Sequence, residues 1–209
     1  VTGGAGFIGS NMIEFLLKKT NFNIISLDNY SSGFKKNHLK NKKVKYLKGD
    51  TKDIKRILNK KKKQIKVIFH FGEFSRIAQS FKEYSKCIDY NLNGSISVLN
   101  FALENKIKII YSATSSMYNN SGLNDNLSPY TWSKSKVVSL IRSYGEWYKL
   151  DYEIVYFFNV YGPRQIIDNR MAAVIGIFEQ QYKKKIPLTV VKPGTQKRDF
   201  THVNDIIQA

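Results

Sequence analysis

The sequence predicts an α/β protein built on a Rossmann-type, doubly wound parallel sheet, and three observations carry this prediction. Short apolar runs rich in β-branched and aromatic residues alternate with longer stretches of helical periodicity, which is the pattern of βαβ units. A glycine-rich turn with the spacing G-x-x-G-x-x-G occupies residues 3–9, directly before the first helical stretch. An acidic residue, Asp28, closes the apolar run that follows that helix.

The expected strands are short and bounded by polar residues, and the expected helices place their apolar residues near one face. Val1 is expected to end a first strand, because the glycine turn follows at once. Further strands are expected at 24–27, 44–47, 67–69, 107–111, 154–158 and, more briefly, 188–191. Helices are expected at 7–19, 52–62, roughly 88–104, 129–149, 172–183 and 204–209.

The alternation of strands and helices stops near Tyr161-Gly162-Pro163. We therefore divide the chain into a Rossmann domain, residues 1–160, and part of a smaller substrate-binding region, residues 161–209. Because the sequence stops inside a helical pattern, we expect this second region to be truncated at its C-terminus.

Composition narrows the function classes. The 209 residues carry a formal charge of +18, and residues 1–66 hold 17 Lys and Arg against 4 Asp and Glu. A specific nucleic-acid site is not favoured, because Lys outnumbers Arg by 28 to 6 and Arg is the usual reader of phosphate and guanine. A solvated Lys-rich face is the preferred interpretation.

No apolar stretch is long enough for a membrane span, and no metal-ligand cluster is visible. Cys87 is the only cysteine, which favours a reducing, cytoplasmic location.

The glycine turn and Asp28 together predict a dinucleotide site. Glycines at this position let backbone amides approach a pyrophosphate at a helix N-terminus. Asp28 stands 19 residues after Gly9, where an acid accepts hydrogen bonds from the ribose hydroxyls and repels a 2′-phosphate. The expected cofactor is therefore NAD rather than NADP.

Tyr130 and Lys134 form a Y-x-x-x-K pair that shares one helix face. A free tyrosine has a pKa of ~10 and is a poor base at neutral pH. A nearby ammonium and the positive nicotinamide ring favour the phenolate and lower that pKa. Thr114 follows the strand expected at 107–111, where its hydroxyl could bond a reacting sugar oxygen beside Tyr130.

Together these motifs resemble the extended short-chain dehydrogenase/reductase family, in its NAD-dependent sugar epimerase/dehydratase branch. The resemblance covers essentially the whole chain and depends on the order and spacing of nine features. They are Thr2 to Gly9, Leu27-Asp28-Asn29, Gly49-Asp50, His70-Phe71-Gly72, Asn91-Leu92-Asn93-Gly94, Thr114 with Tyr118, Tyr130 with Lys134, Asn159 to Arg164, and Arg198-Asp199-Phe200.

The resemblance implies a role for each matching position. Thr114, Tyr130 and Lys134 would be catalytic, with Lys134 also holding the nicotinamide ribose. Asn159 and Arg198 would bind the diphosphate of a nucleotide sugar, and Thr114 would bind the reacting oxygen of its sugar. The implied cofactor-binding residues are Gly3, Gly6, Phe7, Ile8, Gly9, Asp28, Asn29, Asp50, Thr51, Phe71, Gly72, Asn91, Tyr130, Lys134 and Phe158. The family also implies a homodimer formed through the helices at 88–104 and 129–149.

Two departures from the family pattern bear on the reaction. Sugar 4,6-dehydratases of this branch carry an Asp-Glu pair after the threonine, and the related decarboxylases keep the Glu; here Ser115 and Ser116 stand there. Residues 73–76, Glu-Phe-Ser-Arg, replace a run of small residues. The expected function is therefore an NAD-dependent 4-epimerase acting on a nucleotide sugar, most simply a UDP-hexose. Two alternatives stay open: a dehydratase or another NAD-dependent sugar-nucleotide enzyme, and a non-catalytic relative that binds nucleotides or nucleic acid.

Overall fold

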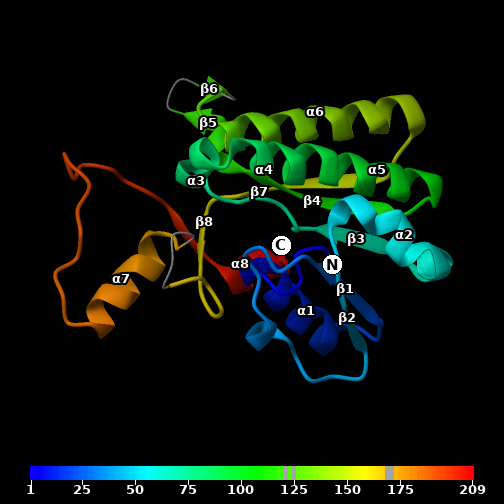
Figure 1. Ribbon diagram of the computed structural model, residues 1–209, viewed down its shortest axis with the longest axis horizontal. Helices are drawn as coiled ribbons and strands as arrows, with labels where there is room; N and C mark the ends of the chain where they lie inside the picture. The colour runs from blue at the N-terminus through cyan, green and yellow to red at the C-terminus, as the bar shows by residue number, and fades with distance from the viewer. Residues whose placement is uncertain (120–121, 124–125, 168–171) are drawn as a thin grey trace.

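The protein is described by a computed structural model at residues 1–119, 122–123, 126–167 and 172–209. Within these ranges a parallel β-sheet forms the middle layer, and helices cover both of its faces (Figure 1). This confirms the predicted doubly wound α/β architecture.

The order of the strands is that of a Rossmann sheet. Thr2 forms parallel bridges to Leu27 on one side and to His70 on the other, and so joins the two halves of the sheet. The order β2-β1-Thr2-β3-β4-β7 is the order 3-2-1-4-5-6 when the Thr2 segment is counted as the first strand. The bridging residue is thus one position later than Val1. The strand bounds are β1 (Ile24–Asp28), β2 (Val44–Lys48), β3 (Val67–His70), β4 (Lys108–Thr114) and β7 (Tyr152–Phe157).

Helices pack on the sheet through apolar side chains. On one face, α1 and α8 meet around Met12, Val203 and Ile207 (Figure 1). On the other face, α5 and α6 bury Leu99 and Val137 completely against the strands. The helix bounds are α1 (Phe7–Lys19), α2 (Ile54–Leu58), α3 (Ile77–Lys82), α4 (Tyr84–Ile88), α5 (Gly94–Glu104), α6 (Pro129–Tyr148), α7 (Val174–Lys183) and α8 (Val203–Gln208).

Helix α6 has a well-defined start and end. The side chain of Ser128 accepts a hydrogen bond from the Thr131 amide at 3.0 Å, and Pro129 occupies the first turn, so the start has both an N-cap and a pre-set φ. The helix stops at Lys149, which takes the left-handed conformation with φ +58°. These ends fix how far Tyr130 and Lys134 lie from the sheet edge.

Two predicted helices are helical throughout, but only part of each is regular α-helix. The stretch 52–62 holds only α2, flanked by the 3-10 turns Thr51–Asp53 and Asn59–Gln64. The second of these turns contains the four-lysine run, which has no apolar side chain to bury against the sheet. The stretch 88–104 becomes α5, and a π turn, Asp89–Asn93, precedes it.

The predicted strand at 188–191 is wrong. Leu188, Val190 and Val191 are exposed and belong to no strand, because no described strand edge lies beside them for pairing. The smaller region instead contains a parallel pair, β8 (Asn159–Tyr161) and β9 (Phe200–His202). A short antiparallel pair, β5 (Tyr118–Asn119) and β6 (Gly122–Leu123), lies between β4 and α6. Since β8 runs across the boundary proposed at residue 160, the division of the chain stays a prediction.

No helix within the described ranges combines the length and apolar character that crossing a bilayer demands.

Candidate active site

The predicted site residues gather at the carboxyl edge of the sheet. Asp28 closes β1, Thr114 closes β4, and residues 71–73 directly follow β3. The first turn of α6 begins beyond Thr114 and brings Tyr130 to the same edge. In doubly wound sheets this edge is where ligands bind.

The glycine turn is built for close approach of backbone to a ligand. Gly3 has φ +68°, and a Cβ there would lie 2.8 Å from the Gly72 amide nitrogen. A Cβ at Gly9 would lie 2.2 Å from the Gly3 carbonyl oxygen. Helix α1 therefore starts tightly against the sheet, with Phe7 and Ile8 in its first turn. Such a cradle fits a pyrophosphate over a helix N-terminus.

Asp28 connects this turn to the end of β1. One carboxylate oxygen, Oδ2, accepts the amide of Ala5 at 2.9 Å, and Oδ1 accepts the amide of Tyr30 at 2.8 Å. Burial raises the pKa of Asp28, and these two hydrogen bonds oppose the rise. The acid thus lies beside the glycine turn, as a ribose-binding carboxylate must.

We expect Asp28→Asn to reduce the preference for NAD over NADP by about tenfold, or ~1.4 kcal/mol, because a neutral amide no longer repels a 2′-phosphate. Titrating both dinucleotides against the variant measures the ratio of dissociation constants. Asp151→Asn, at an exposed carboxylate paired with Lys108, is the matched control. An unchanged ratio in Asp28→Asn would remove Asp28 from the cofactor site.

The other predicted cofactor residues fall into two groups. Asn29 and Asp50 lie together, since the Asn29 amide donates to the Asp50 carboxylate at 3.1 Å; Thr51 follows, buried against Gly94. Phe71 packs against Phe157.

Asn91 and Phe158 have less direct placements. Asn91 is fully buried, and its side-chain oxygen accepts the Phe74 amide at 2.7 Å while its nitrogen donates to Ser133 at 2.9 Å. Asn91 therefore holds the loop after β3, and its contact with a cofactor stays a prediction. Phe158 is 53% exposed between β7 and β8.

Thr114 and Tyr130 are brought together as predicted. A hydrogen bond joins their side chains, and it lowers the pKa of Tyr130. Desolvation raises the pKa more than this hydrogen bond lowers it, and the negative charge of Glu73 raises it further. The pKa of Tyr130 is therefore raised to about 12. The phenol is thus protonated at neutral pH in the protein alone.

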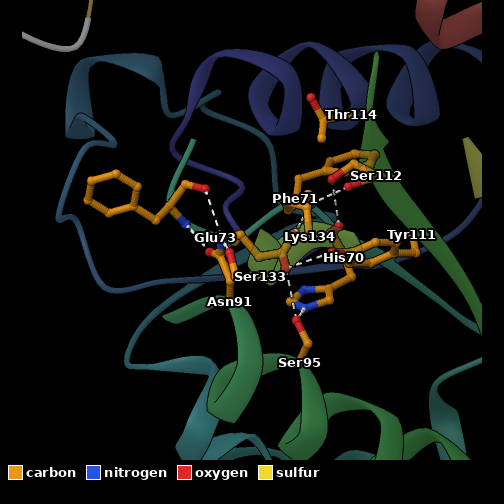
Figure 2. Close-up of polar contacts among 12 residues, drawn as sticks. His70, Phe71, Glu73, Asn91, Ser95, Tyr111, Ser112, Thr114, Ser133 and Lys134 are labelled. Atoms are coloured by element: carbon orange, nitrogen blue, oxygen red, sulfur yellow. Dashed lines mark hydrogen bonds and ion pairs between the residues drawn. The ribbon is translucent and has the colours of Figure 1, made fainter. Parts of the chain in front are cut away.

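Lys134 is held by three groups of the chain itself (Figure 2), and its contact with a nicotinamide ribose stays a prediction. Its ammonium is ion-paired with Glu73, donates to the carbonyl of Ser112, and lies 4.2 Å from the centre of the Tyr111 ring. Burial lowers the pKa of Lys134, and Glu73 opposes that. In this arrangement the pKa of Tyr130 is raised, with desolvation as the largest cause; a lower pKa beside Lys134 and a bound nicotinamide ring stays a prediction.

Glu73 is the functional candidate that the sequence reasoning missed. Its side chain is only 3% exposed and lies beside Lys134. The signal was available: a carboxylate three residues after the end of β3, at the ligand edge of the sheet, in a segment that departs from the family pattern.

Of the two predicted diphosphate ligands, Asn159 lies in β8 and Arg198 lies two residues before β9. Asn159 in β8 pairs in register with Phe200 in β9, and its side chain donates to the Asp199 carbonyl at 2.9 Å. Arg198, one residue before, is exposed. A cavity of about 1080 Å³ adjoins this region, lined by residues 161–165 and by α7 with the segment after it; it does not include Tyr130 or Lys134.

Within the described part of the chain, no three His, Cys, Asp or Glu side chains are grouped as a metal site requires. His70 is packed, as expected, with both ring nitrogens hydrogen-bonded.

Known proteins resemble this chain in sequence and in fold. The putative UDP-glucose 4-epimerase of Methanocaldococcus jannaschii is 32% identical over 221 residues, covering all of this chain and 70% of the relative. The crystal structure of a UDP-glucose 4-epimerase with UDP-glucose from Thermotoga maritima superposes with a TM-score of 0.89 at 26% identity, covering 99% of this chain and 70% of that one. A dTDP-glucose 4,6-dehydratase from Streptomyces venezuelae with NAD bound also gives 0.89 at 26% identity, covering 99% and 68%. The family model described as the NAD dependent epimerase/dehydratase family matches residues 1–209, and the chain belongs to that family.

Proposed function

We propose that the protein is an NAD-dependent nucleotide-sugar 4-epimerase acting on a UDP-hexose. The observation that carries this proposal is the pair Ser115 and Ser116 directly after Thr114. The Ser116 hydroxyl is hydrogen-bonded to Thr114 at 2.9 Å and to Thr131 at 3.3 Å. Hydroxyls therefore stand where dehydratases of the family carry the carboxylates that eliminate water, and 4-epimerisation needs no such pair.

The residues present fit the cofactor of the family. Gly3 and the first turn of α1 would hold the pyrophosphate, Asp28 the adenine ribose, and Lys134 the nicotinamide ribose. NAD bound there would supply a reversible hydride acceptor for C4 of the sugar.

In the proposed reaction Tyr130 takes the proton of the sugar 4-hydroxyl and gives it back at the end. Thr114 orients the reacting oxygen. The pKa of Tyr130 is raised to about 12. Tyr130 therefore becomes a base only when positive charge is brought beside it. The 4-keto sugar then turns over in the site, so that hydrogen returns to the opposite face.

A product assay tests the proposal. The protein is incubated with UDP-glucose, UDP-N-acetylglucosamine and UDP-glucuronate, with and without added NAD, and products are separated by chromatography and weighed. We expect an isomer of equal mass from one of them. A product 18 mass units lighter from any nucleotide sugar, with no isomer, would contradict the proposal and assign a dehydratase.

The homodimer through α5 and α6, the cytoplasmic location and the absence of specific nucleic-acid binding stay predictions. Steeply salt-dependent nucleic-acid binding without turnover would favour the non-catalytic alternative.

A further inference from the structure

A buried chain of hydrogen bonds runs from the glycine turn to Lys134. Thr2 contacts His70. His70 contacts Ser95, and Ser95 contacts Glu73, which pairs with Lys134 (Figure 2). These residues come from the Thr2 segment, β3, α5, the loop after β3, and α6. Nothing in the proposed 4-epimerase reaction assigns a role to this chain.

The direction of each hydrogen bond follows from counting donors. Thr2 Oγ1 accepts the amides of Phe71 at 3.1 Å and Gly72 at 3.0 Å, so both lone pairs are used and its hydroxyl donates to His70 Nδ1 at 2.7 Å. Burial lowers the pKa of His70 to about 4, so the ring is neutral and carries its proton on Nε2. That proton is donated to Ser95 at 2.9 Å.

The chain ends on a fully satisfied carboxylate. Glu73 Oε1 accepts the hydroxyls of Ser95 at 2.9 Å and Tyr111 at 3.0 Å. The other oxygen, Oε2, accepts the ammonium of Lys134. The two side chains are only 3% and 4% exposed, so each charge is compensated mainly by the other and, at the carboxylate, by the two hydroxyl donors.

Lys134 therefore has two fixed acceptors, Glu73 and the Ser112 carbonyl. An ammonium has three donors, and these two contacts set the direction of the third. Without Glu73, a buried ammonium would lose its counter-ion and its proton more easily.

We propose that Glu73 is a positioning residue of this active site: it holds Lys134 charged and aimed, and its negative charge opposes deprotonation of Tyr130. The proposal rests on the proposed function insofar as Lys134 serves the reaction. The titratable and charged groups that face Tyr130 and Lys134 from the surrounding elements are Glu73, His70, Arg76, Cys87 and Tyr111.

The first test is kinetic and uses a double-mutant cycle. Glu73→Gln, Lys134→Met and the double variant are compared with wild type for kcat and KM across pH. We expect Glu73→Gln to reduce kcat about tenfold or more. We also expect the alkaline fall in activity to begin at a lower pH than in the wild type, because Lys134 without its counter-ion loses its proton more easily. In the Lys134→Met background the same substitution should change kcat less than about twofold, since residues that act through one another are not additive. Equal losses in both backgrounds, or no loss, would overturn the proposal.

The second test needs no turnover. Tyrosine labelled with ¹³C at Cζ is titrated by NMR, and Tyr130→Phe identifies the Tyr130 signal. The comparison is made in the Lys134→Met background, where no ammonium can gain or lose a proton. There, removing the Glu73 charge should lower the pKa of Tyr130 by about half a unit or more. Glu104→Gln, which removes a carboxylate from the exposed pair with Lys55, should leave it unchanged. An unchanged pKa in the double variant, relative to Lys134→Met, contradicts the proposal.

A variant that keeps the charge guards against a folding failure. If Glu73→Gln does not fold, Glu73→Asp keeps the charge and is expected to retain most of kcat; a tenfold loss in this charged variant with normal stability would favour shape over charge and overturn the proposal. If the wild type makes the epimer and Glu73→Gln is as active as the wild type, the 4-epimerase proposal stands and the positioning role of Glu73 is wrong. If the wild type makes no epimer but removal of the Glu73 charge still lowers the pKa of Tyr130, the 4-epimerase proposal is wrong and the positioning role of Glu73 stands.

Discussion

Tyr130→Phe is expected to reduce turnover by ~10²–10⁴-fold, the usual range for loss of a general acid–base group, while the protein still folds and binds NAD. Phenylalanine keeps the ring that packs in the site and removes only the hydroxyl that is hydrogen-bonded to Thr114. The proton of the sugar 4-hydroxyl then has no acceptor. Turnover is measured by product formation, and cofactor content by absorbance of the purified protein.

The matched control for this prediction is Tyr144→Phe. Tyr144 lies on the same helix, α6, and its hydroxyl donates to Asn100 at 2.8 Å, away from Thr114. We expect this variant to keep normal turnover. If Tyr130→Phe also kept it, the proposed mechanism would be wrong.

Gly9→Ala is expected to destabilise the fold by about 2 kcal/mol and to weaken NAD binding. The added Cβ would lie 2.2 Å from the Gly3 oxygen, 2.8 Å from the Gly3 carbonyl carbon and 2.9 Å from the Gly4 Cα. All three are backbone atoms, so the cost should fall at the upper end of the ~1–3 kcal/mol seen for overpacking. The ~1 kcal/mol that alanine gains over glycine inside a helix offsets only part of it.

Gly6→Ala is the graded comparison for stability. Its Cβ would meet only the Gly3 oxygen, at 3.1 Å, so a shift of a few tenths of an ångström relieves it. Denaturant unfolding and titration with NAD check both variants. A Gly9→Ala protein as stable as Gly6→Ala, with normal NAD affinity, would contradict the close packing described for the turn.

Much of the fold could be predicted because local signals and the sheet agree. The apolar runs around Ile24 and Ile109 are β-branched and bounded by polar residues, and both are strands. Ser128 and Pro129 marked the start of α6 by chemistry that depends on near neighbours alone. Leu188–Val191 looked equally strand-like, but a strand requires a partner edge, and the sequence does not show whether one is present.

The candidate site was predictable where a motif has a fixed spacing and not where partners meet across the fold. Asp28 and the glycine turn are linked by their distance in sequence, and the structure joins them through the Ala5 amide. Tyr130 and Lys134 share a helix face, but the ammonium is paired with Glu73, which lies 61 residues away in sequence. The balance of charge around Tyr130 therefore could not be inferred from the Y-x-x-x-K spacing.

The most direct test of the account is the fate of the hydrogen on C4 of the sugar. The protein is given the UDP-hexose that it isomerises, labelled with deuterium at C4, in ordinary water, and the epimer is examined by NMR and mass spectrometry. The account predicts that the epimer keeps its deuterium at C4, because the same hydrogen leaves and returns inside the site. Loss of deuterium to solvent, or a product 18 mass units lighter, would contradict 4-epimerisation by transient oxidation at C4.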